Sequence, residues 1–214
     1  MSFKAAHGIF IAIVVAVCGL SRTAAAEPIA LVGFGDSLMA GYELPAEEAF
    51  PVQLETALRA RGFDVTIANA GVSGDTTSGG LARIDWSVPD GTKGVIFELG
   101  ANDALRGVAP EETEQNLDRM VSGLKSRGIA VLLVGILAPP NMGEEYGARF
   151  NGIYERIAKK HGVPLYPFFL DGVVTKADLQ LDDGMHPNGK GVGVMVERML
   201  PTAEAFVKSL GVTE

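Results

Sequence analysis

The sequence alternates between short apolar runs and stretches with helical periodicity, and this alternation limits the fold more than any other feature. The runs lack strict apolar–polar alternation, which is typical of strands buried on both faces. They span residues 29–34, 65–68, 94–99, 131–137 and 163–166. Helical spacing appears between and after them, at Leu117, Met120, Val121 and Leu124, less regularly at Phe150, Ile153, Tyr154 and Ile157, and from Val196 to Val207. The alternation predicts parallel strands joined by helical crossovers, in an α/β layered sandwich.

The first 26 residues differ in kind from the rest. Lys4 gives a positively charged start, residues 9–20 form an apolar stretch, and residues 24–26 are alanines of the A-x-A type. This order is typical of a secretory signal peptide, which we expect to be cut before Glu27. No later segment reaches the roughly 20 apolar residues of a transmembrane helix. We therefore expect residues 27–214 to form one domain, exported to the periplasm or secreted.

Charge and cysteine content exclude several classes of function. The chain has 18 Lys and Arg against 26 Asp and Glu, a formal net charge of −8. The only charged residues among the first 26 are Lys4 and Arg22, so the expected mature chain is more acidic still. Nucleic acid is therefore not an expected partner. The single cysteine, Cys18, lies inside the predicted signal peptide, so we expect neither a disulfide nor thiol chemistry in the mature chain.

Several loops of unusual composition follow the predicted strands. Ligands of such sheets bind at the carboxyl ends of the strands, so these loops are the place to look for a site. They read "GDSL" from Gly35, "NAGVSGDTTSGG" from Asn69, "GANDALRG" from Gly100 and "APPNMGEEYG" from Ala138. A fifth polar loop, "LDDGMHPNGKG" from Leu181, precedes the last predicted helix.

Histidine content narrows the choice of a catalytic base, because only His161 and His186 follow the predicted signal peptide. His161 precedes Gly162 at the end of a helical pattern, which favours a structural role at a helix C-terminus. His186 lies three residues after Asp183, so this loop can supply both a base and a carboxylate that orients it. The alternative is that the loop only makes a turn and caps the last helix, and for an isolated D-x-x-H this is the commoner case.

Ser37 admits two roles, the cap of a helix and a nucleophile, and the two can coexist. The loop around it matches neither nucleotide-binding fingerprint, G-x-x-x-x-G-K-[ST] or G-x-G-x-x-G. The elbow G-x-S-x-G of α/β-hydrolases is missing too, because Met39 occupies the second glycine position.

Acyl transfer at Ser37 requires hydrogen-bond donors for an oxyanion. The Gly74 N–H and the Asn102 amide are candidates, although each residue alone is more often part of an ordinary turn. The convergence of all these residues on one edge of one sheet favours the catalytic interpretation. A metal site built from Asp182, Asp183 and His186 is an alternative with a poor supply of ligands.

In this order the blocks resemble those of the SGNH or GDSL hydrolase superfamily, named after Ser, Gly, Asn and His. They read "GDSL" with Ser37, "NAGVSGDT" with Gly74, "ELGANDALRG" with Asn102, and "DDGMHPNGKG" with Asp183 and His186. The similarity runs from about Ile29 to the last helix and is greatest to the periplasmic thioesterase I, arylesterase and lysophospholipase group.

The resemblance implies a flavodoxin-like three-layer α/β/α sandwich with a five-stranded parallel sheet. It implies that Ser37 is the nucleophile, His186 the general base and then acid, and Asp183 its orienting partner. The oxyanion hole would consist of the Ser37 N–H, the Gly74 N–H and the Asn102 side chain. Asp36 would support the loop by hydrogen bonding.

The resemblance also implies a serine esterase for small acyl esters, thioesters and lysophospholipids, active as a monomer without metal or cofactor. The loop with Ala138, Pro139 and Met142 corresponds to one that contacts the acyl chain. Two other functions remain open. A carbohydrate O-deacetylase of the same superfamily has weak support from the only tryptophan, Trp86. A non-catalytic flavodoxin-like binding module is disfavoured by the complete set of residues.

Overall fold

Five parallel strands form one sheet in the computed structural model, which describes residues 27–211. The strands are β1 (Ile29–Gly35), β2 (Val65–Gly71), β3 (Gly94–Glu98), β4 (Ala130–Val134) and β5 (Leu165–Tyr166). Their order is β2-β1-β3-β4-β5, and all neighbours pair in parallel. This is the strand order of flavodoxin-like folds, so the predicted fold class is confirmed. The predicted signal peptide, residues 1–26, lies outside the described residues, as do residues 212–214.

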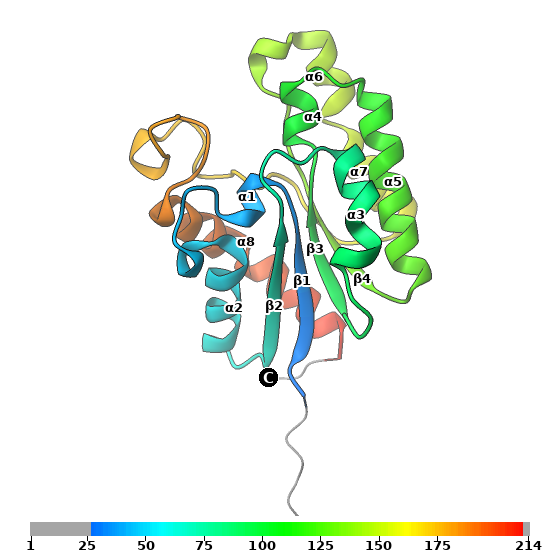
Figure 1. The fold of residues 1–214 in the computed structure, drawn as a ribbon, viewed down its shortest axis with the longest axis vertical. Coiled ribbons are helices and arrows are strands. Elements are labelled where there is room, and N and C mark those ends of the chain that lie inside the picture. Colours follow the sequence, from blue (N-terminus) through cyan, green and yellow to red (C-terminus); the bar gives the residue numbers. More distant parts are fainter. Residues whose placement is uncertain (1–26, 212–214) are drawn as a thin grey trace, which may run out of the picture.

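Helices cover both faces of the sheet and make it the middle of three layers (Figure 1). On one face, α2 (Phe50–Ala60) packs against α8 (Gly189–Ser209). The other face carries α3 (Thr77–Ser87), α5 (Pro110–Ser126) and α7 (Ile153–His161). None of the helices within residues 27–211 is long and apolar enough to cross a membrane.

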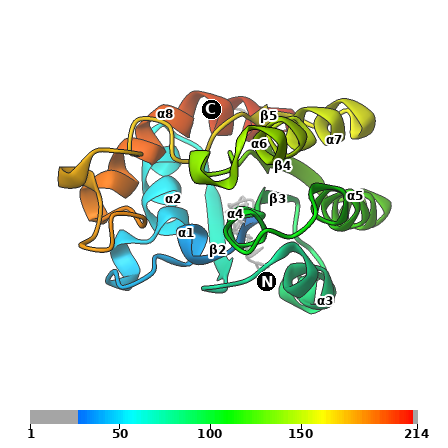
Figure 2. The ribbon, with the colours of Figure 1, turned by 90° about the horizontal axis from the view of Figure 1, so that it is seen from above.

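Short elements gather at the carboxyl edge of the sheet, which Figure 2 views from above. They include α1 (Ser37–Ala40), α4 (Ala101–Leu105) and α6 (Glu144–Phe150). Three 3₁₀ turns cover Ala46–Glu48, Pro140–Met142 and Ala177–Leu179. The loops that the sequence singles out therefore lie at one end of the molecule.

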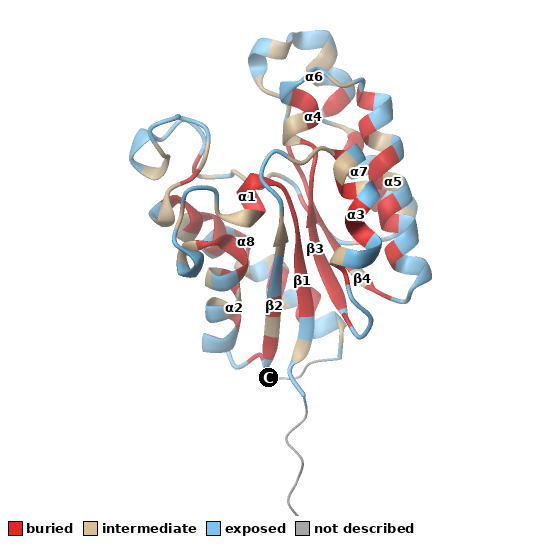
Figure 3. Ribbon diagram, viewed as in Figure 1, coloured by how far each residue is buried: buried red, intermediate tan, exposed pale blue. Residues whose placement is uncertain are grey.

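The core lies on both sides of the sheet. Strands β1, β3 and β4 are buried along nearly all of their lengths, whereas each long helix buries one side only (Figure 3). Fully buried large side chains such as Phe34, Phe97 and Met39 reach up to the carboxyl edge. Each such burial stabilises the fold by about 1.5–3 kcal/mol. The edge that carries the loops is thus supported from below by close-packed side chains.

Arg83 of α3 ties the ends of β1 and β2 to their following loops. Its guanidinium donates to the Gly35 carbonyl at 2.9 Å and to the Ala70 carbonyl at 2.8 Å, and it pairs with Asp75 at 2.7 Å. The guanidinium carbon also lies 4.0 Å from the centre of the Phe34 ring. Because Arg83 is only 7% exposed, these bonds are shielded from water.

Several predicted elements differ in extent from the observed ones: β2 continues past residue 68 to Gly71, and β5 begins at Leu165 instead of residue 163. Strand β4 was predicted to reach Leu137 but ends at Val134. A Cβ at Gly135 would lie 2.1 Å from the Pro167 carbonyl oxygen, so the chain there passes another segment too closely for any side chain. The helical pattern across residues 150–157 belongs to two helices, because the chain turns at Asn151, whose side chain accepts a hydrogen bond from the Ala138 N–H at 2.8 Å.

Candidate active site

Ser37 is the first residue of α1, directly after the end of β1. The prediction that Ser37 caps this helix is wrong. The cap is Asp36, whose carboxylate accepts the Leu38 N–H at 3.0 Å, because the backbone of Ser37 is already helical. The Ser37 side chain points instead to the fifth polar loop, which precedes α8, and its Oγ lies 2.9 Å from His186 Nε2. Ser37 is 9% exposed, so its hydroxyl is nearly shielded from water.

His186 and Asp183 lie in the loop before α8, which forms a small hairpin. Leu181 N–H donates to the His186 carbonyl at 2.8 Å, and Gly184 makes the turn with a φ of 64°. His186 Nδ1 lies 2.6 Å from one oxygen of the Asp183 carboxylate, and the other oxygen accepts the His186 N–H at 3.0 Å. The hydrogen bonds from His186 lower the pKa of Asp183 to about 2. Asp183 is therefore ionised, and it holds the imidazole with its Nε2 toward Ser37.

The same loop also makes the turn and the helix cap that the sequence offers as an alternative. Asn188 is the N-cap of α8 and accepts the Gly191 N–H at 3.0 Å. Its amide donates to the carbonyls of Asp178 and Gln180. The two interpretations are compatible, because the capping residue fixes the base of the hairpin that carries His186.

Three N–H groups near this edge are available as donors. The hydrogen bonds formed within residues 27–211 leave the backbone N–H groups of Ser37 and Gly74 without an acceptor. Gly74 has a φ of 80°, and its carbonyl is held by Arg106 at 2.9 Å. The Asn102 amide donates one proton to Asp36 at 3.1 Å and retains a second one.

Two buried carboxyl groups lie beneath Ser37. Asp36 and Glu98 are both 0% exposed, and the Asp36 N–H donates to the Glu98 carboxyl group at 3.3 Å. Burial raises the pKa of Asp36 to about 6, and burial together with the Asp36 charge raises the pKa of Glu98 well above its usual value. The expectation that Asp36 supports the loop agrees with its hydrogen bonds to Leu38 and Asn102. Sequence reasoning missed Glu98, although a charged residue in an apolar strand is itself a signal.

Tyr42 is a second residue that sequence reasoning missed. Its ring lies 4.5 Å from the His186 ring, centre to centre, with 34° between the planes. The αL residue Gly41, with a φ of 80°, ends α1 and turns the chain just before Tyr42. No pattern in the sequence links Tyr42 to His186, because this contact depends on the folded loops.

The predicted acyl-chain loop lies against the segment that follows α4. Pro139 precedes the 3₁₀ turn that contains Met142. A Cβ on Gly107 would lie 3.6 Å from the end of the Met142 side chain, and the Tyr146 hydroxyl donates to the Val108 carbonyl at 2.8 Å. The loop thus lies against the segment that directly follows α4, the helix that carries Asn102.

The remaining candidates lie elsewhere. His161 ends α7 before the αL residue Gly162, and its Nε2 lies 2.7 Å from Asp118, which confirms its structural role. Trp86 is 74% exposed but lies at the C-terminal end of α3, away from the edge that carries Ser37. Within the part of the chain that the structure describes, no group of three or more His, Cys, Asp and Glu side chains can hold a metal ion.

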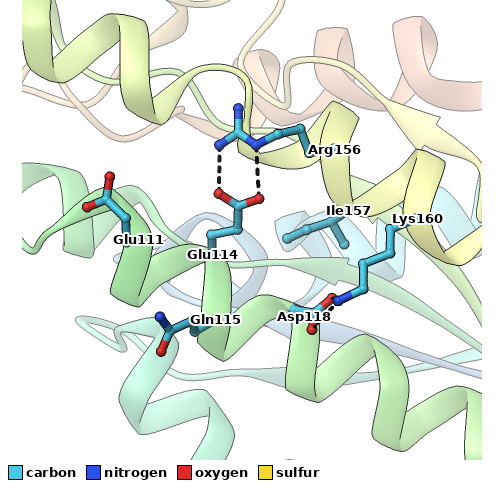
Figure 4. A pocket seen from close by; sticks show the side chains of 7 residues that line it. All are labelled: Glu111, Glu114, Gln115, Asp118, Arg156, Ile157 and Lys160. Carbon is cyan, nitrogen blue, oxygen red and sulfur yellow. Dashed lines mark hydrogen bonds and ion pairs between the residues drawn. The ribbon is translucent and has the colours of Figure 1, made fainter.

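A pocket of about 350 Å³ lies between α5 and α7, far along the chain from Ser37 (Figure 4). Two ion pairs lie along it: Arg156 binds Glu114 at 2.7 Å, and Lys160 binds Asp118 at 2.8 Å. None of the three residues Ser37, Asp183 and His186 lines it. This pocket is therefore separate from the hydrogen-bonded group at the sheet edge.

Several known proteins are similar to this chain in sequence and in structure. Residues 34–194 match the model of the GDSL-like lipase/acylhydrolase family. An arylesterase of Vibrio mimicus is 45% identical over 161 residues, which cover 73% of this chain and 79% of the relative. The thioesterase 1/protease 1/lysophospholipase L1 of Escherichia coli strain K12 is 39% identical over 168 residues, 78% of each chain. The crystal structure of AlinE4, an SGNH-hydrolase family esterase, is 44% identical, with a TM-score of 0.72 over 85% of this chain and 97% of that one.

Proposed function

Because this chain belongs to the GDSL-like lipase/acylhydrolase family and is a hydrolase of ester bonds, we propose that Ser37 is its nucleophile and that an acyl-enzyme forms on it. The observation that carries the proposal is the continuous hydrogen-bonded line from Ser37 Oγ through His186 to Asp183, at 2.9 and 2.6 Å. Serine hydroxyls need an adjacent base to become nucleophilic, and the base needs a third group that fixes its tautomer.

The proposed reaction has two stages. Ser37 Oγ attacks the carbonyl carbon of the ester while His186 Nε2 takes its proton, and the imidazolium that forms is stabilised by the Asp183 carboxylate. His186 then gives this proton to the leaving alcohol or thiol. In the second stage water attacks the acyl carbonyl carbon while His186 takes a proton from it. The bond between the acyl carbon and Ser37 Oγ then breaks, His186 returns the proton to Ser37 Oγ, and the carboxylic acid is released.

The oxyanion hole in this proposal consists of the Ser37 N–H, the Gly74 N–H and the second amide proton of Asn102. The unused donors of these residues support the assignment, since a donor that is already paired must break a bond before it can help. Removing one such donor typically lowers kcat by about 10²–10³-fold.

The proposed substrates are small acyl esters, thioesters and lysophospholipids. The names of the two relatives, arylesterase and thioesterase 1/protease 1/lysophospholipase L1, support this range. The loop with Ala138, Pro139 and Met142 is proposed to contact the acyl chain, because it packs against the segment directly after the helix that carries Asn102. We also propose that the enzyme is a monomer.

We also propose that the protein is exported to the periplasm or secreted. The charged start, apolar stretch and alanines of residues 1–26 support a signal peptide that is cut before Glu27. Fractionation of expressing bacteria, followed by mass measurement of the protein in each fraction, tests this. A chain that retains residues 1–26 and stays in the cytoplasm would contradict it.

The catalytic proposal is tested with p-nitrophenyl esters of increasing acyl length and with a palmitoyl thioester. Wild-type protein is expected to hydrolyse several of them, and Ser37→Ala to lose turnover by about 10³-fold or more while it unfolds at a similar temperature. Full activity in Ser37→Ala would remove Ser37 from the mechanism. The thioester and ester rates then rank the substrate classes.

A further inference from the structure

Glu98 stands at a position where an apolar residue is expected. It is the last residue of β3, it is 0% exposed, and its neighbour in register on β4 is Val134. Its Oε2 accepts the Asp36 N–H at 3.3 Å, but its Oε1 accepts no hydrogen bond from any described residue. None of the ion pairs formed within residues 27–211 includes Glu98 or Asp36. An ionised carboxylate without a cation is strongly disfavoured in such a place.

The groups that surround the two carboxyls do not supply the missing charge. Arg83 is paired with Asp75 and donates to backbone carbonyls. The Tyr154 hydroxyl donates to the Leu99 carbonyl at 2.7 Å. His186 uses its two ring nitrogens for Ser37 and Asp183. One of the two carboxyl groups must therefore be protonated.

A single proton on Glu98 reduces the buried charge of the two carboxyl groups to one. A neutral carboxylic acid has an O–H donor, and the charge of Asp36 favours that proton on Glu98. The pKa of Glu98 is raised well above its usual value by burial and by Asp36, whereas that of Asp36 is about 6. At neutral pH the pair then carries one negative charge, on Asp36.

Asp36 connects Glu98 to the site through hydrogen bonds to Leu38 and Asn102. Its carboxylate accepts the Leu38 N–H at 3.0 Å, which sets the first turn of α1 behind Ser37. It also accepts the Asn102 amide at 3.1 Å, which orients the second amide proton of Asn102. A second negative charge in the pair would lie beneath the position where an oxyanion forms, and it would oppose that oxyanion.

We propose that Glu98 is a positioning residue of the esterase site, a neutral acid that holds Asp36 in the orientation that directs Asn102 and the Ser37 N–H toward the reacting carbonyl. The inference rests on the proposed function, because the groups it positions are the proposed oxyanion donors. Glu98 itself does not touch the substrate.

The kinetic test compares Glu98→Gln with Glu98→Leu. Glutamine is neutral, accepts from the Asp36 N–H and donates to the Asp36 carboxylate, so Glu98→Gln is expected to keep kcat within about 3-fold of wild type. Leucine removes both bonds, and a misplaced donor lowers kcat by about 10- to 100-fold with a small change in KM. Ile96→Val is the matched control: it loosens the same strand away from Asp36, and should lower the unfolding temperature without changing kcat.

A direct readout is the ¹³C chemical shift of the Glu98 carboxyl carbon in wild-type protein at pH 7, assigned by its loss in Glu98→Gln. The shift of a neutral acid is expected. An ionised carboxylate there would overturn the proposal, as would a kcat in Glu98→Gln as low as in Glu98→Leu, or a wild-type kcat in Glu98→Leu. If Glu98→Leu does not fold, Glu98→Gln and the chemical shift still decide. If wild-type protein hydrolyses no ester, the proposed function fails, whereas the chemical shift still tests the neutral acid.

Discussion

At the scale of single residues, the Asp183 carboxylate determines which nitrogen of His186 carries the proton. The carboxylate accepts the Nδ1–H at 2.6 Å and leaves Nε2 to accept from Ser37. Asparagine at this position offers an amide donor to Nδ1 and thus favours the opposite tautomer. We expect Asp183→Asn to lower kcat by about 10³–10⁴-fold, measured on the preferred p-nitrophenyl ester.

The neighbouring Asp182 provides a matched control, because it is an exposed carboxylate in the same loop. Asp182→Asn should leave kcat within about 2-fold of wild type, since it removes the same charge at nearly the same place without touching the imidazole. Equal losses in both variants would show that loop charge, and not the tautomer, controls the rate.

The Tyr42 ring, 4.5 Å from the His186 ring, can stabilise the imidazolium that forms when His186 takes the Ser37 proton. A ring face near a cation contributes about 0.5–2 kcal/mol, so Tyr42→Leu is expected to lower kcat by about 2- to 30-fold. Tyr42→Phe retains the ring and should keep most of the activity. A loss of the same size in both variants would assign the effect to the hydroxyl group instead.

At the scale of elements, the loop after β4 is expected to set the preference for acyl length. Ala138 is a small residue beside the stiff pair Pro139–Pro140. Ala138→Leu should shift the optimum of kcat/KM along a series of p-nitrophenyl acyl esters, because each methylene in an apolar contact is worth about 1–3 kcal/mol. An unchanged profile would exclude this loop from the acyl site.

Sequence patterns were sufficient to place some strands and helix starts, but not others. Strands β1 and β3 could be placed from their apolar runs, since burial on both faces leaves a clear pattern. The end of β4 could not, because it depends on the approach of Pro167 to Gly135 across the fold. Likewise, "GDSL" predicts a helix start but not whether Asp36 or Ser37 caps it, because either side chain can accept the N–H groups.

Some residues of the site could also be found from the sequence, whereas others could be found only from the fold. Asp183 and His186 lie in one loop, at a spacing that allows a carboxylate to meet an imidazole but that also occurs in many loops without this contact. Glu98 and Tyr42 act through contacts with residues 62 and 144 positions away, and such contacts leave no local pattern. The sequence shows only that Glu98 is a charged residue in an otherwise apolar run. The folded structure is needed to show that its carboxyl group contacts Asp36.

At the scale of the whole molecule, the buried Asp36 makes stability depend on pH. Its folded pKa of about 6 exceeds the usual value of 3.8, so the native state binds this proton more tightly than the unfolded chain does. The stability from this group is present below about pH 4 and is lost as the pH rises through about 6. The shift corresponds to about 3 kcal/mol.

Urea unfolding of wild type and Asp36→Asn at pH 4 and at pH 7 measures this effect. The free energy of unfolding of wild type minus that of Asp36→Asn should fall by about 2 kcal/mol between the two pH values, because asparagine does not titrate. The corresponding difference for the exposed Asp182→Asn should stay nearly constant. A difference for Asp36→Asn that is flat or that rises with pH would contradict the assigned direction.

The most direct test of Ser37 as the nucleophile of an ester hydrolase is intact-mass spectrometry after treatment with a serine-reactive phosphonate. We predict one adduct per chain, located on Ser37 by peptide mapping. Ester hydrolysis should be lost in proportion to labelling, and Ser37→Ala should carry no adduct. A folded wild-type protein that hydrolyses esters but carries its adduct on another residue, or none at all, would contradict it.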